Sequence, residues 1–288
     1  MSALVLAHRG ASAYRPELTE AAIRTAVDQG ADGIEVDVVP SRDGRLVVRH
    51  DRSLAPTTDL VARRGRDRRV DETDWADLAG LRARERWPAL RPGSARFDGR
   101  EPLLALPDVV RIAEAADLLL VVEIKDATAF SAVGLDPAPL VARDLAGARC
   151  RVVLESFEKR PLDALQHLGL PRFYLLDEHG RAADEAPDGP GYAAELADPA
   201  ALTRFEGVSL PLSRATRAHV AAVHAVGLQV WTFTLRAENA FLPAAHRGDG
   251  DPAALGDWRS AWSAVLDAGV DGVFADAPDL ALELVRSR

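Results

Sequence analysis

Strand-like and helix-like segments alternate along almost the whole chain, and this alternation constrains the fold more than any other feature. Eight short apolar runs have the length and composition of buried strands: residues 4–7, 33–38, 118–124, 151–154, 173–176, 207–210, 229–234 and 272–275. Helical patterns separate most of them: residues 19–29, 106–116, 137–146, 161–168, 216–226, 258–268 and 278–285. Eight strand–helix units in 288 residues predict an α/β fold, a (β/α)8 TIM barrel that forms a single domain over residues 1–288.

Two segments depart from this pattern. Residues 51–101 are rich in arginine and too long for an ordinary connection, so we expect a small inserted subdomain after the second strand, over one mouth of the barrel. Residues 177–205 are rich in glycine and proline and predict a short or irregular helix. This weak unit leaves a doubly wound open sheet as the alternative fold.

The charge of the chain limits its partners. A formal net charge of −9 disfavours nucleic acid, because binding a phosphate backbone requires a basic surface. No apolar run is long enough to span a membrane. Only seven residues precede His8, too few for a signal peptide, so we expect a cytoplasmic protein. The sequence leaves monomer and homodimer open.

Two carboxylates interrupt the second apolar run. Side chains alternate along a strand, so Glu35 and Asp37 share one face while Ile34, Val36 and Val38 share the other. A buried carboxylate is costly unless a cation accompanies it. Oxygen donors at positions i and i+2 of a rigid strand suit a hard divalent ion, Ca²⁺ or Mg²⁺.

Further polar residues stand where other predicted strands end. Glu123 and Lys125 share a face at the carboxyl end of the third run, and His8 and Arg9 end the first. Barrel enzymes place their sites at this end of the strands. We therefore expect these four side chains to lie near Glu35 and Asp37.

The dipeptide Asp43-Gly44 predicts a hairpin turn after the second strand. If the turn is centred on these two residues, paired residue numbers sum to 87, and Asp37 lies opposite His50. A bulge would shift this register by one residue. The predicted pairing brings a second histidine to the acidic group.

The predicted site has the charge and the titratable groups for hydrolytic phosphoryl transfer. Three carboxylates (Glu35, Asp37, Glu123) and two cations (Arg9, Lys125) give a charge of −1, which a divalent ion would change to +1. A singly charged phosphodiester fits the second state. His8 and His50 are suited to serve as general base and general acid.

These residues resemble the glycerophosphodiester phosphodiesterase family. The resemblance extends over nearly the whole chain, at residues 7–12, 16–17, 30–37, 43–44, 50–51, 123–125, 227–228, 231–232, 269–276 and 278–279. Residues 236–239 and 241–243 are similar to the branch that includes the periplasmic bacterial enzymes.

The resemblance implies metal-dependent hydrolysis of glycerophosphodiesters to glycerol 3-phosphate and an alcohol. It implies one Ca²⁺ or Mg²⁺ ion at Glu35, Asp37 and Glu123, with His8 and His50 as the catalytic acid/base pair. It further implies that substrate contacts Arg9 and Lys125 at its phosphate and Trp231 at its glycerol end. In the mechanism proposed for such enzymes, the glycerol hydroxyl next to the ester attacks phosphorus, and water opens the resulting cyclic phosphate.

Two positions depart from the family pattern. Leu18 stands where the family commonly has asparagine, and Glu155 stands where glutamine is frequent. We expect Glu155 to add a negative charge near the mouth of the site. Two alternative functions stay open: a lysophospholipase D-like activity on lysophospholipids, and a non-catalytic barrel that binds phosphodiesters. A sugar-phosphate isomerase or aldolase barrel is disfavoured because its phosphate usually lies near strands seven and eight.

Overall fold

Parallel strands close into a barrel in the computed structural model, which describes residues 2–288. Within that range one sheet contains nine strands: β1 Leu4–His8, β2 Gly33–Pro40, β3 Leu46–Val48, β4 Leu119–Ile124, β5 Val152–Ser156, β6 Arg172–Leu175, β7 Gly207–Pro211, β8 Gln229–Leu235 and β9 Gly272–Ala275. All except β3 run parallel, and β1 pairs with both β2 and β9 to close the barrel. The predicted (β/α)8 barrel is confirmed, and the open sheet is excluded.

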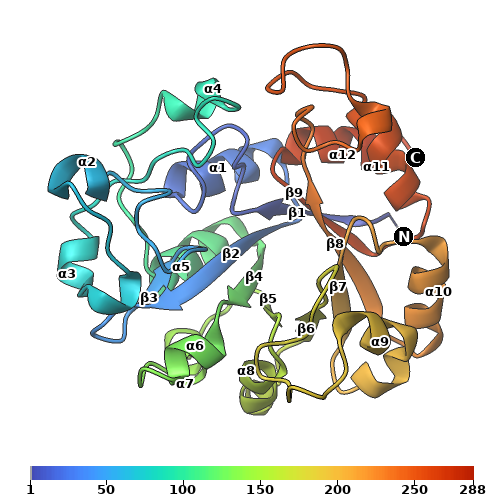
Figure 1. Ribbon diagram of the computed structural model, residues 1–288, viewed down its shortest axis with the longest axis horizontal. Coiled ribbons are helices and arrows are strands. Elements are labelled where there is room, and N and C mark those ends of the chain that lie inside the picture. The colour runs from blue at the N-terminus through green and yellow to red at the C-terminus, as the bar shows by residue number, and fades with distance from the viewer. Residues whose placement is uncertain (1) are drawn as a thin grey trace.

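Helices connect the barrel strands and lie around them (Figure 1). They are α1 Glu20–Gln29, α5 Leu106–Ala116, α6 Ala127–Ser131, α7 Pro137–Asp144, α8 Lys159–Ala164, α9 Tyr192–Ala197, α10 Arg217–Ala225, α11 Trp258–Leu266 and α12 Pro278–Arg286. Short 3-10 turns add η2 Gln166–Leu168, η3 Pro199–Leu202 and η4 Ala244–His246. None of the helices that the structure describes is long and apolar enough to cross a membrane.

Local sequence signals set the boundaries of α1 and its distance from β1. The Thr19 hydroxyl accepts a hydrogen bond from the Ala22 N–H at the first turn, and Gly30 ends the helix at φ +81°. Gly10 lies at φ +78°, where a Cβ atom would come within 2.7 Å of the Ala22 carbonyl carbon. Glycine at this position lets the chain turn against α1 directly after β1.

The barrel interior and the helix layer bury different faces of each strand. One apolar cluster fills the interior: Leu6, Leu119, Val121, Val153, Phe173, Trp231 and Phe274. Ile34, Val36 and Val38 of β2 belong instead to the larger cluster that includes residues of the surrounding helices. Alternation along β2 therefore turns Glu35 and Asp37 inward, as the sequence predicts.

Residues 51–101 contain only short helical segments: α2 Leu60–Arg64, η1 Val70–Glu72, α3 Trp75–Leu78 and α4 Pro92–Ala95. A separate apolar cluster joins this inserted segment to the β2–β3 hairpin and α6: Val39, Val47, Leu54, Leu60, Val70, Leu78, Leu81, Ala83, Leu103 and Phe130. In Figure 1 α2 and α3 lie beside β2 and β3 at the edge of the molecule. The inserted segment thus has apolar packing of its own.

The hairpin register differs by one residue from the prediction. Val38 pairs with Val48 and Pro40 with Leu46, so paired numbers sum to 86 rather than 87. The loop has three residues instead of two: Ser41 N–H donates to the Arg45 carbonyl at 2.8 Å, and Gly44 adopts φ +74°. A type I turn followed by a left-handed glycine produces this arrangement. The backbone of Asp37 consequently accepts from Arg49 N–H, and His50 follows one residue later.

Candidate active site

A cavity of about 270 Å³ opens at the carboxyl ends of the barrel strands. Six of the eight predicted site residues line this cavity, together with apolar and charged residues from the later strands. The lining comprises His8, Arg9, Glu35, His50, Glu123, Lys125, Glu155, Phe157, Leu175, Phe233, Thr234, Arg236 and Phe274. Residues that are up to 117 positions apart in the early part of the chain therefore meet in one site, as predicted.

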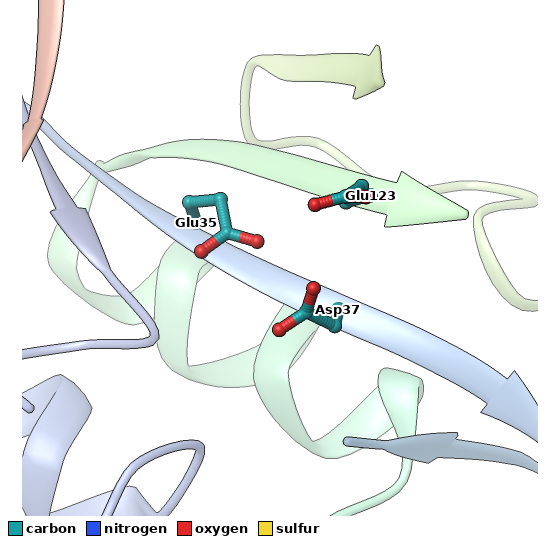
Figure 2. A group of neighbouring side chains, drawn as sticks. All are labelled: Glu35, Asp37 and Glu123. Atoms are coloured by element: carbon teal, nitrogen blue, oxygen red, sulfur yellow. The ribbon is translucent and has the colours of Figure 1, made fainter. Parts of the chain in front are cut away.

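Three carboxylates converge beneath this cavity. Glu35 and Asp37 come from β2 and Glu123 from the adjacent β4, and Figure 2 shows all three on one side of these strands. One oxygen atom of each lies within 4.8 Å of the others. The pairing of Asp37 with Glu123 across the parallel ladder creates this arrangement. Asp37 is fully buried and does not itself line the cavity, whereas Glu35 and Glu123 do.

Two cations accompany the carboxylates. Arg9 donates its backbone N–H to Glu35 Oε2 at 3.0 Å, and its Nε lies 3.1 Å from Asp37 Oδ2. Lys125 Nζ lies 2.7 Å from Glu123 Oε1 and 3.7 Å from Asp37 Oδ1. Burial opposes both positive charges, but the neighbouring carboxylates outweigh it and raise the pKa of Arg9 and of Lys125.

The cations do not satisfy all three acids. Burial, together with the charges on the other carboxylates, raises the pKa of Glu35 and of Glu123. Burial acts in the same direction on Asp37, but Arg9, His50 and Lys125 overcome it and lower its pKa. Among residues 2–288, Glu35 Oε1 and both Asp37 oxygens have no aligned hydrogen-bond donor. An oxygen-only cluster with unsatisfied buried acceptors fits a hard divalent cation.

Asp276, which directly follows β9, contacts the imidazole of His8. The His8 Nδ1 lies 2.6 Å from Asp276 Oδ1. Burial and the adjacent Arg9 charge lower the pKa of His8 to about 4, despite Asp276. Burial opposes ionisation of Asp276, but Arg236, Arg91 and His8 outweigh it and hold its pKa well below the usual range. A neutral His8 must then donate from Nδ1, which leaves Nε2 as the proton acceptor toward the cavity.

His50 has an equivalent partner. Its Nδ1 lies 2.7 Å from Oδ1 of the next residue, Asp51. Burial opposes the charge of Asp51, but His50 and Arg86 overcome it and lower the Asp51 pKa. Each histidine that lines the cavity therefore contacts an ionised carboxylate through Nδ1. This pairing leaves Nε2 of both rings available for substrate.

Trp231 does not lie where the resemblance implies. Its side chain is 2% exposed and stacks on Phe173 in the barrel interior, with ring centroids 3.9 Å apart. Phe233, two residues further along the same face of β8, lines the cavity instead. Side chains at the same face occupy successive depths along a strand, so the prediction placed the aromatic contact one layer too deep.

Leu18 occupies a backbone conformation that leucine rarely adopts. Its φ is +58°, and its N–H donates to the Arg9 carbonyl at 3.0 Å. Asparagine tolerates this left-handed region better than leucine does. Leu18 nevertheless packs in the main apolar cluster, 5% exposed.

Glu155 lies at the floor of the cavity, not near its mouth as predicted. It is 1% exposed, accepts from the Ser209 hydroxyl at 2.6 Å and pairs across the sheet with Glu123. Burial and the charges on Glu123 and Asp37 raise its pKa well above the usual value. Glu155 is therefore harder to ionise than an exposed glutamate.

Exchanging this acid for glutamine should stabilise the protein in the presence of chelator. Because the pKa of Glu155 is raised in the folded protein, folding holds its proton to higher pH than the unfolded chain does, so the stability cost of this group grows as the pH rises above about 4.5. Glu155→Gln should raise the Tm by about 2–4 °C at pH 8 and by under about 1 °C at pH 4.5. Differential scanning calorimetry at both pH values measures the shift, with the exposed Glu283→Gln as control. A pH-independent shift would contradict the assignment.

Three further residues at the site, Asp51, Asp276 and Arg236, were not predicted from the sequence. Asp276 directly follows β9 and Arg236 directly follows β8. Because barrel enzymes form their sites at the carboxyl ends of the strands, these two positions in the sequence could have indicated site residues. Asp51 adjoins His50 in the chain. The contacts of Asp51 with His50, of Asp276 with His8 and of Arg236 with Asp276 could not be read from the sequence, because they depend on where side chains point.

Comparison with known proteins gives consistent results over most of the chain. Residues 8–280 match the glycerophosphoryl diester phosphodiesterase family. A stretch of 155 residues, 53% of this chain, is 35% identical to the uncharacterised protein YqiK of Bacillus subtilis. It spans 57% of that relative, little more than half of its length.

Two further proteins are similar over nearly their whole length. "Probable glycerophosphodiester phosphodiesterase 2" of Mycobacterium tuberculosis is 28% identical, with 99% of this chain and 91% of the relative covered. The solved structure of a phosphodiesterase from Oleispira antarctica, in complex with the product sn-glycerol-3-phosphate, superimposes with a TM-score of 0.72. The two structures share 21% identity over 99% of this chain and 97% of the other, a likeness that shows the fold.

Proposed function

Because this chain belongs to the glycerophosphoryl diester phosphodiesterase family, we propose that it hydrolyses glycerophosphodiesters to glycerol 3-phosphate and an alcohol. The observation that carries the proposal is the convergence of His8, His50, two cations and two carboxylates on one small cavity, with the third carboxylate, Asp37, within 4.8 Å of the other two. The Oleispira relative holds sn-glycerol-3-phosphate, which is the product expected here. The volume of about 270 Å³ suits a water-soluble head group of this size.

Arg9 and Lys125 would bind the phosphodiester. Both line the cavity, and both are held charged by buried carboxylates. Their positive charges would stabilise the negative charge that develops on the phosphoryl oxygens in the transition state. Phe157 and Phe233 form an apolar wall beside this polar floor, with ring centroids 5.8 Å apart. That wall would contact the carbon atoms of glycerol.

Glu35, Asp37 and Glu123 would hold one divalent ion, Ca²⁺ or Mg²⁺. The residues fit such an ion by their oxygen-only chemistry, their separation of at most 4.8 Å and their unsatisfied acceptor atoms. When bound, the ion would act as a Lewis acid toward the phosphoryl group and bring the charge of the site from −1 to +1.

The histidines would carry the protons. His8 is neutral at neutral pH, so its Nε2 can accept the proton of the glycerol hydroxyl as that oxygen bonds to phosphorus. His50 would donate a proton to the departing alcohol oxygen as its bond to phosphorus breaks. Water would then open the cyclic phosphate with the two roles exchanged, which returns each histidine to its starting state.

Phosphorus NMR tests the proposed function directly. Purified protein should convert glycerophosphocholine or glycerophosphoethanolamine to glycerol 3-phosphate with saturating Ca²⁺ or Mg²⁺, and excess chelator should abolish the product signal. Lysophosphatidylcholine in the same panel tests the lysophospholipase D-like alternative, which predicts faster turnover of that lipid. Absence of product from every glycerophosphodiester, with either ion, would overturn the proposal.

A further inference from the structure

Two arginines of the inserted segment reach the carboxylates behind the two histidines. Arg86 Nη2 lies 2.7 Å from Asp51 Oδ2, and the other oxygen of Asp51 contacts His50 Nδ1 at 2.7 Å. The chain of contacts therefore runs from the inserted segment through Asp51 to a ring that lines the cavity.

The second histidine has the same arrangement. Arg91 Nη2 lies 2.7 Å from Asp276 Oδ2, and the other oxygen of Asp276 contacts His8 Nδ1 at 2.6 Å. Arg236 Nε adds a contact of 2.9 Å to the same Asp276 oxygen. In both cases an arginine occupies one carboxylate oxygen and the imidazole occupies the other.

The two arginines are themselves held firmly. Arg86 forms a two-point contact with Glu17, at 2.9 Å from Nε and 2.7 Å from Nη2. Arg91 Nε contacts Glu238 at 2.5 Å, and its Nη1 donates to the Ser12 carbonyl at 3.3 Å. These carboxylates hold the guanidinium groups in planes that suit a second carboxylate contact.

Trp87 connects the two arginines. The guanidinium carbons of Arg86 and Arg91 lie 5.9 Å and 5.0 Å from the Trp87 ring, which packs on Phe241 at 4.9 Å. Both arginines thus sit in one short stretch of the inserted segment that packs against the barrel. A shift of this stretch would displace both carboxylates at once.

We propose that Arg86 and Arg91 are positioning residues that orient His50 and His8 through Asp51 and Asp276. Each arginine fixes a carboxylate so that it accepts from Nδ1–H, which holds the imidazole in the tautomer whose Nε2 faces the cavity. In the opposite tautomer, His8 would present a donor where the first step needs an acceptor, and His50, once it has given up its proton, would present a donor where the second step needs an acceptor. The inference rests on the proposed function for its kinetic consequence, whereas the tautomer is a property of the protein itself.

Kinetics of four variants test the proposal. Arg86→Met and the pair Arg91→Met/Glu238→Gln remove the positioning contacts, and the second substitution avoids leaving Glu238 buried without a partner. Arg91→Lys keeps the charge without the two-point geometry. Arg84→Met is the matched control, because Arg84 is half exposed in the same segment and pairs with Asp98.

We expect kcat to fall about 10- to 100-fold in Arg86→Met and in Arg91→Met/Glu238→Gln, with KM within about threefold of the wild-type value. Arg91→Lys should lie between these values and wild type, and the control should lie within about twofold of wild type.

Nitrogen-15 NMR of the histidine rings separates positioning from a merely structural role. In wild type the neutral form of both rings should show protonated Nδ1. Arg86→Met should shift neutral His50, and Arg91→Met/Glu238→Gln neutral His8, toward protonated Nε2, while Arg84→Met should leave both rings unchanged and thermal denaturation should still show a folded protein. A fall in kcat with unchanged tautomers, or unchanged tautomers and unchanged kcat, would overturn the proposal. If wild type hydrolyses no diester but the tautomers still shift, the positioning role stands and the proposed function fails.

Discussion

Replacing His8 by alanine should lower the rate of glycerophosphodiester hydrolysis by about 10²- to 10⁴-fold, and His50→Ala should have an effect of similar size. Each ring supplies a proton transfer that its neighbours are poorly placed to replace. Among the described residues that line the cavity, the other titratable groups are arginines, a lysine, the proposed ion ligands Glu35 and Glu123, and Glu155, which accepts from the Ser209 hydroxyl. Asp276 keeps Arg91 and Arg236 as partners in His8→Ala, so the fold should persist.

The leaving group distinguishes the two roles. A glycerophosphodiester of nitrophenol releases a stable phenolate that needs no proton, so it bypasses general acid catalysis. His50→Ala should recover most of its lost rate on this substrate, whereas His8→Ala should not, because formation of the nucleophile still requires a base. Stopped-time assays on both substrates measure the ratio.

The exposed His167→Ala serves as control for the loss of an imidazole far from the cavity. A near-normal rate for either site variant would remove that histidine from the mechanism. Recovery of His8→Ala and not of His50→Ala on the nitrophenyl substrate would reverse the assignment of acid and base.

The barrel and the acidic group could be predicted because they depend on local rules. Alternation of side chains along a strand settles which face Glu35 and Asp37 share, whatever the rest of the chain does. The closed parallel sheet then brings Glu123 beside Asp37, since neighbouring strands end at the same edge. Burial in an otherwise apolar run made these residues conspicuous.

The remaining features depend on geometry that the sequence does not encode locally. The choice between a two-residue and a three-residue hairpin loop at Gly44 changes the register by one, and both loops accept the same residues. Asp276 contacts His8 across 268 positions of sequence, and Arg91 contacts Asp276 across 185. A run of arginines in the inserted segment gives no indication of which ones are buried.

The ion site leads to the second large effect. Wild-type protein should gain thermal stability when Ca²⁺ or Mg²⁺ is titrated after chelation, by about 2.7 kcal/mol at a free concentration of 100 times Kd. Asp37→Asn should lower the affinity at least about 100-fold, because it removes a ligand charge from a set of three oxygens within 4.8 Å. Turnover at a fixed ion concentration should fall with it.

The variant also tests the charge balance without added ion. The Asp37 carboxylate attracts the buried charges of Arg9 and Lys125 but repels those of Glu35 and Glu123, so its two effects on stability oppose each other. In chelator, Asp37→Asn should therefore change the Tm far less than ion binding changes the Tm of wild type. The exposed Asp249→Asn controls for removal of an acid elsewhere and should leave the ion-induced shift intact. Equal ion-induced shifts in wild type and Asp37→Asn would mean that the ion binds outside this cluster, and no shift in wild type would contradict an ion site altogether.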